Sequence, residues 1–86
     1  MSDTLLQFPC AFPIKIMGLD EPAFRDLAVA LVSQHVRGLA DDAVRVSRSS
    51  NGKYLSVTVT IEAQSQHQLD AIYRDLTAHE QVKVVL

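Results

Sequence analysis

The feature that most constrains this chain is a strictly alternating run at residues 53–63. Apolar side chains occupy every second position, at Leu55, Val57, Val59 and Ile61, and mostly polar side chains stand between them. A period of two is typical of a strand with one buried face and one wet face. A shorter alternating run, 43–48, precedes it, and Asn51-Gly52 lies in the turn 49–52. Because both turn residues tolerate positive φ, the segment predicts a β-hairpin.

A second strand pattern lies near the start of the chain, at residues 12–18. Phe12, Ile14 and Ile16 alternate there with Pro13, Lys15 and Met17. Proline restricts strand pairing, so regular strand is expected to begin at Ile14.

A helix is predicted between these strands. Asp20 is in position to act as the N-cap, followed by Glu21 and Pro22 in the first turn. Apolar or weakly polar side chains then recur at helical spacing, at Phe24, Leu27, Ala28, Leu31, Val32 and His35. Gly38 supplies the expected stop, which gives a helix of roughly four turns.

The remaining segment predicts a second helix and a last strand. Ser65 and Gln68 have the spacing of a capping box. The apolar stripe that follows consists of Leu69, Ile72, Tyr73 and Leu76. Residues 81–86 are rich in β-branched side chains and predict the final strand.

This order of elements, βαββαβ, predicts an α+β ferredoxin-like fold, a two-layer sandwich. With right-handed crossovers the four-stranded antiparallel sheet has the order 4-1-3-2, and both helices cover one face. The other face stays open. A chain of 86 residues with 48% hydrophobic residues fits one domain, 1–86, in which 1–7 is expected to be disordered or extended.

Several classes of protein are excluded by simple features. The lone Cys10 forms no internal disulfide, and residues 1–18 lack the basic start of a secretion signal. The longest apolar run, 27–32, is far shorter than the roughly 20 residues that span a bilayer. A cytoplasmic protein without a membrane partner is therefore expected. The net charge of −2 argues against a broad electrostatic grip on nucleic acid.

The open sheet face is the leading candidate for a binding surface. The alternation assigns to it Lys15, Met17, Arg45, Ser47, Tyr54, Ser56, Thr58, Thr60, Glu62, Lys83 and Val85. Three cations stand there against one acid, which favours an anionic small ligand or an acidic protein partner. The candidate binding residues are Lys15, Arg45, Tyr54, Ser56, Thr58 and Lys83. The alternative is a merely solvated face, whose edge cations prevent aggregation. Tyr54 alone is too little for a base-stacking platform, so RNA binding is not expected.

The last strand is the second candidate surface. Val82, Val84, Val85 and Leu86 give it high β-propensity at a sheet edge, broken only by Lys83. Such an edge can pair with a second copy, so a homodimer or a ligand-free structural subunit is the alternative function.

Signatures of catalysis and of metal or cofactor binding are missing. There is no Cys-x-x-Cys pair, and His35, His67 and His79 share no metal-binding spacing. His35 and Tyr73 fall on apolar helix stripes and are expected in the core. Gly18 could leave room for an anion at the helix start, although Asp20 and Glu21 oppose it and a glycine required by the turn explains it more simply. No enzyme and no cofactor is expected.

Short motifs spread along the chain resemble one family. They are Phe8-Pro9, Phe12, Lys15 to Gly18, Ser49 to Tyr54, Ser56 to Val59 and Val82 to Leu86. Together they are similar to the YbeD-like family of small bacterial proteins. The resemblance implies a ferredoxin-like fold related to ACT regulatory domains, and a regulatory role linked to lipoate metabolism. It supplies no catalytic or binding residues.

Overall fold

The structure, a computed structural model, describes residues 6–86. Most of the predicted N-terminal segment 1–7 lies outside the described residues, and Leu6 and Gln7 belong to no helix or strand. The elements in chain order are β1 (Cys10–Leu19), α1 (Phe24–Ser33), the 3₁₀ turn η1 (Asp41–Ala43), β2 (Val44–Arg48), β3 (Tyr54–Ala63), α2 (Gln66–Ala78) and β4 (Val84–Val85).

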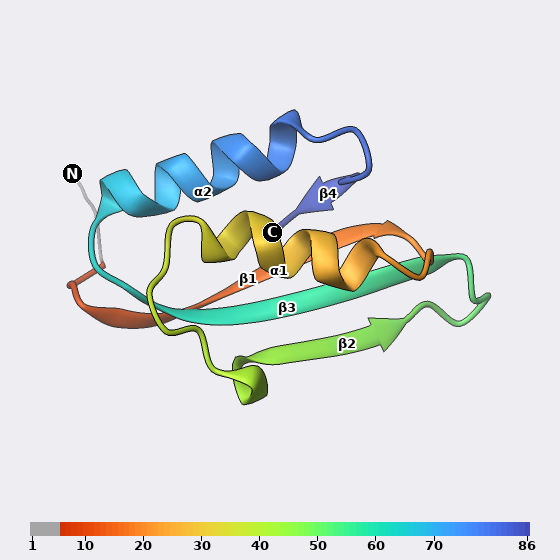
Figure 1. Cartoon of the computed structure of the whole chain (residues 1–86), viewed down its shortest axis with the longest axis horizontal. Coiled ribbons are helices and arrows are strands. Elements are labelled where there is room, and N and C mark those ends of the chain that lie inside the picture. Colours follow the sequence, from red (N-terminus) through yellow and green to blue (C-terminus); the bar gives the residue numbers. More distant parts are fainter. Residues whose placement is uncertain (1–5) are drawn as a thin grey trace.

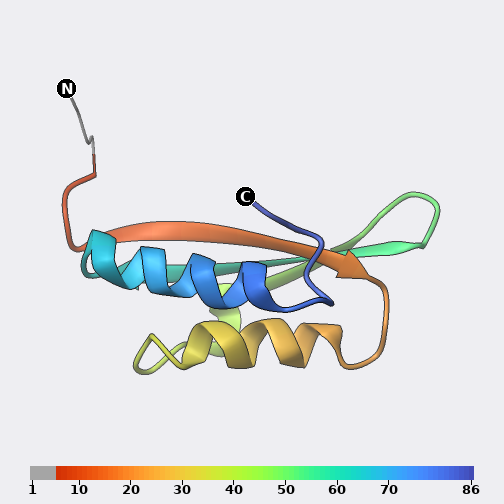
Figure 2. The ribbon, with the colours of Figure 1, turned by 90° about the horizontal axis from the view of Figure 1, so that it is seen from above.

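The four strands form one antiparallel sheet in the order β2-β3-β1-β4. This is the predicted order 4-1-3-2 in reverse, so the ferredoxin-like topology is confirmed. Figure 1 shows α1 in front of the strands and α2 along the border beside β4, and Figure 2 shows both helices on the same side of the sheet. Among residues 6–86, none of the helices covers the opposite face, as the sequence predicts.

The core lies between the sheet and the two helices. Alternate residues of β1 and β3, such as Ile14, Ile16, Val57 and Val59, are fully buried there. The helices add Phe24, Ala28, Val32, Leu69, Ile72 and Leu76. No polar or charged residue of 6–86 is buried. The binary pattern of the sequence therefore decides which face of each element packs inward.

The first strand begins earlier than predicted, at Cys10 rather than at Ile14. Lys15 exchanges both backbone hydrogen bonds with Leu86, so odd-numbered residues of β1 direct their backbone groups toward β4. Pro13 is odd, and β4 pairs only with Ile16 and Met17. Its nitrogen thus points to an edge without a strand partner in the described chain, where a missing N–H costs nothing.

The first helix is shorter than predicted, and its start was wrongly assigned. It has ten residues, and the N-cap Ala23 makes no side-chain cap. The Asp20 N–H donates to the Lys53 carbonyl (2.9 Å), and the Asp20 carboxylate accepts from Arg48 Nε (2.8 Å). Both of these groups of Asp20 bond to the β2–β3 hairpin and not to the helix, which begins one turn later, at Phe24.

The second helix has the predicted cap in modified form. Ser65 Oγ accepts from the Gln68 N–H at 3.1 Å, which confirms the N-cap. The Gln68 side chain, however, accepts from the Gln64 N–H rather than returning to Ser65. It also donates to the His35 carbonyl (2.8 Å), and thereby joins the start of α2 to the end of α1.

The hairpin is present, with a turn of different geometry. The Gly52 N–H donates to the Ser49 carbonyl, and Gly52 alone in the turn has positive φ. Asn51 has negative φ, and its side chain takes part in the turn. Its Oδ1 accepts from the Ser49 hydroxyl and from the Lys53 N–H.

The final strand is short, and Val85 and the preceding Lys83 face the other way than predicted. The register sets Val85 opposite the buried Ile16 and Val84 opposite Met17. Val85 therefore packs against the core, whereas Val84 is 45% exposed. The prediction that Val85 and Lys83 share the open face was wrong, because consecutive valines carry no alternation from which to read the phase.

No helix within residues 6–86 combines the length and the apolar character that crossing a membrane would require.

Candidate functional site

The centre of the open face is a row of three residues on neighbouring strands. Thr58 of β3 lies directly between Lys15 of β1 and Arg45 of β2. With strands about 4.8 Å apart, the two cations start about 10 Å from each other. Both are exposed, and neither forms an ion pair with a carboxylate within residues 6–86. We call Lys15, Thr58 and Arg45 the cationic row.

Apolar side chains adjoin this row, and all of them except the half-buried Met17 are exposed. Met17 and Val84 are opposite one another, as are Leu19 and Tyr54. Leu86 lies opposite Lys15 through their paired backbone bonds and is 65% exposed. We call Met17, Leu19, Tyr54, Val84 and Leu86 the apolar margin. The open face is thus amphipathic, with cations in the middle and an apolar border toward β4.

A hydroxyl lies between the row and the margin. Ser56 is flanked on its strand by Tyr54 and Thr58, and faces Met17 and Ser47 across the sheet. Its Oγ is buried and has no hydrogen-bond partner within the described residues. A buried hydroxyl without a partner is unfavourable, and on the open face of the described residues Ser56 carries this cost.

The predicted sixth binding residue, Lys83, stands apart from the other five. Its Nζ donates to the Glu80 carbonyl at 3.3 Å, and its N–H donates to the Met17 carbonyl. The side chain lines a small cavity at the end of the sheet instead of the open face. The structure therefore brings together Lys15, Arg45, Tyr54, Ser56 and Thr58 on one surface, and separates Lys83 from them.

That small cavity occupies the corner where a glycine had suggested room for an anion. It measures about 280 Å³ and is lined by Leu19, Glu21, Phe24, Glu80, Gln81 and Lys83. A Cβ on Gly18 would lie 2.5 Å from the Gln81 carbonyl oxygen and from the Phe24 ring. Close packing therefore explains the glycine, and the two glutamates disfavour an anion beside it.

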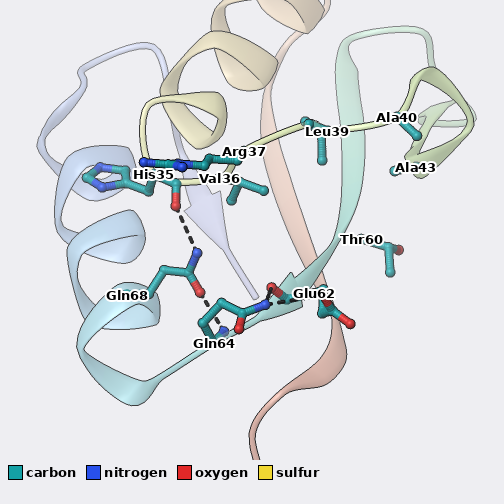
Figure 3. Close-up of a pocket in the computed structure, with 11 residues that line it drawn as sticks. His35, Val36, Arg37, Leu39, Ala40, Ala43, Thr60, Glu62, Gln64 and Gln68 are labelled. Carbon is teal, nitrogen blue, oxygen red and sulfur yellow. Dashed lines mark hydrogen bonds between the residues drawn. The ribbon is translucent and has the colours of Figure 1, made fainter.

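A larger cavity of about 620 Å³ lies at the opposite end of the sheet (Figure 3). One wall is the connection from α1 to β2, and the other is the end of β3 with the start of α2. Its lining residues are His35, Val36, Arg37, Gly38, Leu39, Ala40, Ala43, Thr60, Glu62, Gln64 and Gln68. The volume falls in the usual range for ligand sites.

Hydrogen bonds fix one wall of this cavity. Gln68 joins the His35 carbonyl to the Gln64 N–H, as the dashed lines in Figure 3 show. Gln64 Nε2 donates to the carbonyl oxygen of Glu62 (3.3 Å) and to its carboxylate (3.2 Å). Behind this wall His35 Nε2 lies 2.5 Å from Asp75 Oδ2, which ties α1 to α2. The wall is therefore preformed.

Within residues 6–86, no three His, Cys, Asp or Glu side chains converge as metal ligands would. Cys10 is a half-buried free thiol at the start of β1. Tyr73 packs beside the core, its hydroxyl donates to the Leu86 carbonyl (3.3 Å), and burial raises the pKa of its phenol.

The outer edge of β4 offers little for strand pairing. Leu86 uses both backbone groups on β1, so the N–H and C=O of Val85 point outward. The strand has two residues, Val84–Val85. A homodimer through this edge would have a very short ladder of hydrogen bonds. Of the residues predicted for it, Val82, Val84, Val85 and Leu86, the side chain of Val85 already packs against the core.

Sequence reasoning missed two parts of these surfaces. Leu19 and Leu86 were not assigned to the open face, because the first ends a strand and the second follows an unphased run. The cavity residues Arg37 and Gln64 carry no motif, since they meet Gln68 of α2 only through the packing of separate connections. The capping-box spacing of Gln68 was the one signal that pointed there.

Comparisons with known proteins agree with this architecture. A family described as "Protein of unknown function (DUF493)" matches residues 3–86. A UPF0250 protein from Paraburkholderia phytofirmans is 46% identical over 86 residues, which is all of this chain and 97% of that protein. A UPF0250 protein from Neisseria gonorrhoeae is 43% identical over 83 residues, 96% of this chain and 91% of that protein.

A solved structure shares the fold. The solution structure of protein HP0495 from H. pylori superposes with a TM-score of 0.75 at 15% identity, and the match covers 96% of this chain and 87% of that chain. At this identity the likeness supports the fold alone.

Proposed function

This chain belongs to the DUF493 family, whose relatives are named UPF0250 proteins, and we propose that it is a non-enzymatic module that binds an acidic protein surface on its open sheet face. The single observation that carries the proposal is the cationic row. Lys15 and Arg45 flank Thr58 on a chain of net charge −2, and no carboxylate within residues 6–86 pairs with either. Unpaired cations on an acidic protein favour an acidic partner.

The distribution of acids supports this choice of partner. Glu62 is the one carboxylate on the strands of the open face, and its side chain is engaged by Gln64. The other described acids lie on helices and connections, at Asp20, Glu21, Asp26, Asp41, Asp42, Asp70, Asp75 and Glu80. An acidic partner is therefore attracted to the sheet and repelled from the helical side.

The shape of the surface favours a protein over a small anion. Neither cavity has Lys15, Thr58 or Arg45 in its wall. Small molecules are held by concave sites that enclose most of their surface, whereas protein interfaces are broad surfaces that carry apolar and charged residues together. The apolar margin beside the cationic row has the second character.

The resemblance to YbeD-like proteins makes the proposal narrower. It adds a regulatory role, in which the bound partner is a protein of lipoate metabolism, and the lone Cys10 favours a cytoplasmic setting. Lipoate is itself an anion with an apolar end, so it matches the chemistry of the open face. Free lipoate therefore belongs in the test as a separate probe.

Charge reversal on the open face tests the proposal. Lys15→Glu with Arg45→Glu reverses the row, and Arg25→Glu with Arg74→Glu makes the same change in net charge on the helices. Each protein is used to capture partners from the source bacterium, and the captured protein is purified and its affinity for each variant measured. We expect an acidic protein that binds the wild type and the helix variant, and at least about tenfold weaker binding to the reversed row.

Three outcomes would overturn the proposal. One is that the captured protein binds the wild type and the variant with the reversed row with equal affinity. Another is that the helix variant loses as much affinity for this protein as the variant with the reversed row. The third is binding of free lipoate to the row without any protein partner, which would assign the face to a small anion. Sedimentation of the chain alone as a stable dimer through β4 would support the structural alternative instead.

A further inference from the structure

The larger cavity lies where β3 has lost its neighbour. β2 pairs with β3 from Leu55 to Val59, whereas β3 continues to Ala63. Four residues at the end of β3 therefore have no strand partner on the β2 side within residues 6–86. Thr60 and Glu62 of this unpartnered stretch line the cavity, together with residues of the α1–β2 connection. Figure 3 shows both residues on the strand side of this space.

The register shows which backbone groups reach this edge. Even-numbered residues of β1 bond to β3, and their partners on β3 are odd-numbered, as in Ile14 with Val59. Even-numbered residues of β3 therefore direct their N–H and C=O groups toward the β2 side. The hydrogen bond from the Ser49 N–H to the Tyr54 carbonyl agrees with this assignment. Thr60 and Glu62 thus present backbone groups to the cavity.

We propose that this cavity is a docking site for an extended peptide segment of a partner protein, which adds to the Thr60–Glu62 edge of β3 in line with β2. Four vacant residues correspond to a strand segment of about 13 Å. Strand addition of this kind is a recurring mode of peptide recognition, in which the backbone supplies affinity and neighbouring side chains supply specificity. The site is independent of the open-face row.

The walls define the chemistry of the segment. Val36 and Leu39 pack against the core side of the cavity and suit an apolar side chain. Arg37 and Glu62 are its charged lining residues, so the preferred segment has an apolar residue with an acidic and a basic residue nearby. The bond from Gln64 Nε2 to the Glu62 carbonyl is long, at 3.3 Å, and comes from an exposed side chain. A peptide N–H can therefore take its place.

The other free edges are less suited to an added strand. The exposed edge of β1 carries Pro13, which has no N–H to donate. The outer edge of β4 is two residues long. The outer edge of β2 is free, but no residue of β2 (Val44–Arg48) lines the cavity.

The test uses two variants of one residue. Thr60→Pro removes the N–H that faces the cavity and leaves the bonds to β1 intact, because those come from odd-numbered residues. Thr60→Val keeps the N–H and the shape of the side chain. A random heptapeptide library displayed on phage is selected on the immobilised full chain, and the selected peptides are titrated into both variants.

We expect selected peptides to bind the wild type and Thr60→Val alike, and to bind Thr60→Pro about tenfold more weakly or worse. In the wild type, the Thr60 and Glu62 amide protons should gain protection from exchange when a peptide binds, and this readout does not depend on the folding of the proline variant. Three results would overturn the proposal. The selected peptides could bind Thr60→Pro as tightly as the wild type, or the selection could give no binders. Protection from exchange could also be confined to Val44, Val46 and Arg48 on the outer edge of β2.

Discussion

Gly18 is the residue where side-chain size is most tightly limited. It lies in β1 under the Phe24 ring and beside the backbone of Gln81, and an added methyl group would come within 2.5 Å of both. The backbone oxygen is held by the connection to β4, so the strain cannot be relieved by rotating one side chain. The glycine is therefore a requirement of packing between β1, α1 and the last connection.

Gly18→Ala is expected to destabilise the protein by about 1–3 kcal/mol, the usual range for an overpacked core position. The free energy of unfolding in urea measures the loss. Gly52→Ala is the matched comparison, because its added Cβ meets nothing within 4 Å and only the positive φ of 72° is unfavourable. A Gly18→Ala protein as stable as the wild type would contradict the close contact.

Tyr73 links stability to alkaline pH. Burial raises the pKa of its phenol above the ordinary value of about 10, so the folded protein holds this proton more tightly than the unfolded chain. The stabilising contribution is complete below the unfolded pKa and is lost as the pH rises through the folded pKa. Ionisation also removes the donor of the bond to the Leu86 carbonyl.

The free energy of unfolding of the wild type is therefore expected to fall more steeply than that of Tyr73→Phe as the pH rises above about 10, the ordinary pKa of the phenol. Denaturant titrations at several pH values, compared between the two proteins, isolate Tyr73 from the other groups that ionise in this range. Parallel curves for the two proteins would show that the phenol does not take part.

At the scale of elements, the sequence predicted each helix and strand by type, because their periodicities are clear. Boundaries failed where one residue serves two elements. Asp20 has the composition of a helix cap but completes the sheet, and Pro13 interrupts a strand pattern but lies on an unpartnered edge. Neither outcome is visible before the neighbours of the residue are known.

The strand β4 shows why part of the candidate site could not be predicted. In the run Val82 to Leu86 four apolar residues surround Lys83, so either phase buries a valine. The structure packs the partly buried Val85 against the core and turns Val84 outward, which replaces a basic residue on the open face by an apolar one. The expectation of three cations there becomes two cations and an apolar margin.

Two matched substitutions check this phase. Val85→Ala removes apolar area that packs against the core and is expected to cost about 1 kcal/mol, whereas Val84→Ala at the exposed position should leave the free energy of unfolding within about 0.5 kcal/mol of the wild type. Urea denaturation distinguishes them. The reverse order of effects would restore the phase predicted from sequence.

At the scale of the whole molecule, the charge of −2 is an average over two different surfaces. The helical side carries most of the acids, and the open face carries Lys15 and Arg45 between hydroxyl groups and an apolar margin. This separation of charge orients an acidic partner before contact. The attraction between the partner and the open face weakens as salt screens the charges. The cavity at the far end of the sheet adds a second surface of different chemistry.

The central claim, that the open face binds an acidic protein, is tested most directly by amide chemical shifts of the isotope-labelled chain as the captured partner is added. The account predicts that the largest changes lie at Lys15, Met17, Arg45, Ser56 and Thr58, and that they shrink as salt is raised. Changes confined to α1 and α2, with the open face unaffected, would contradict it.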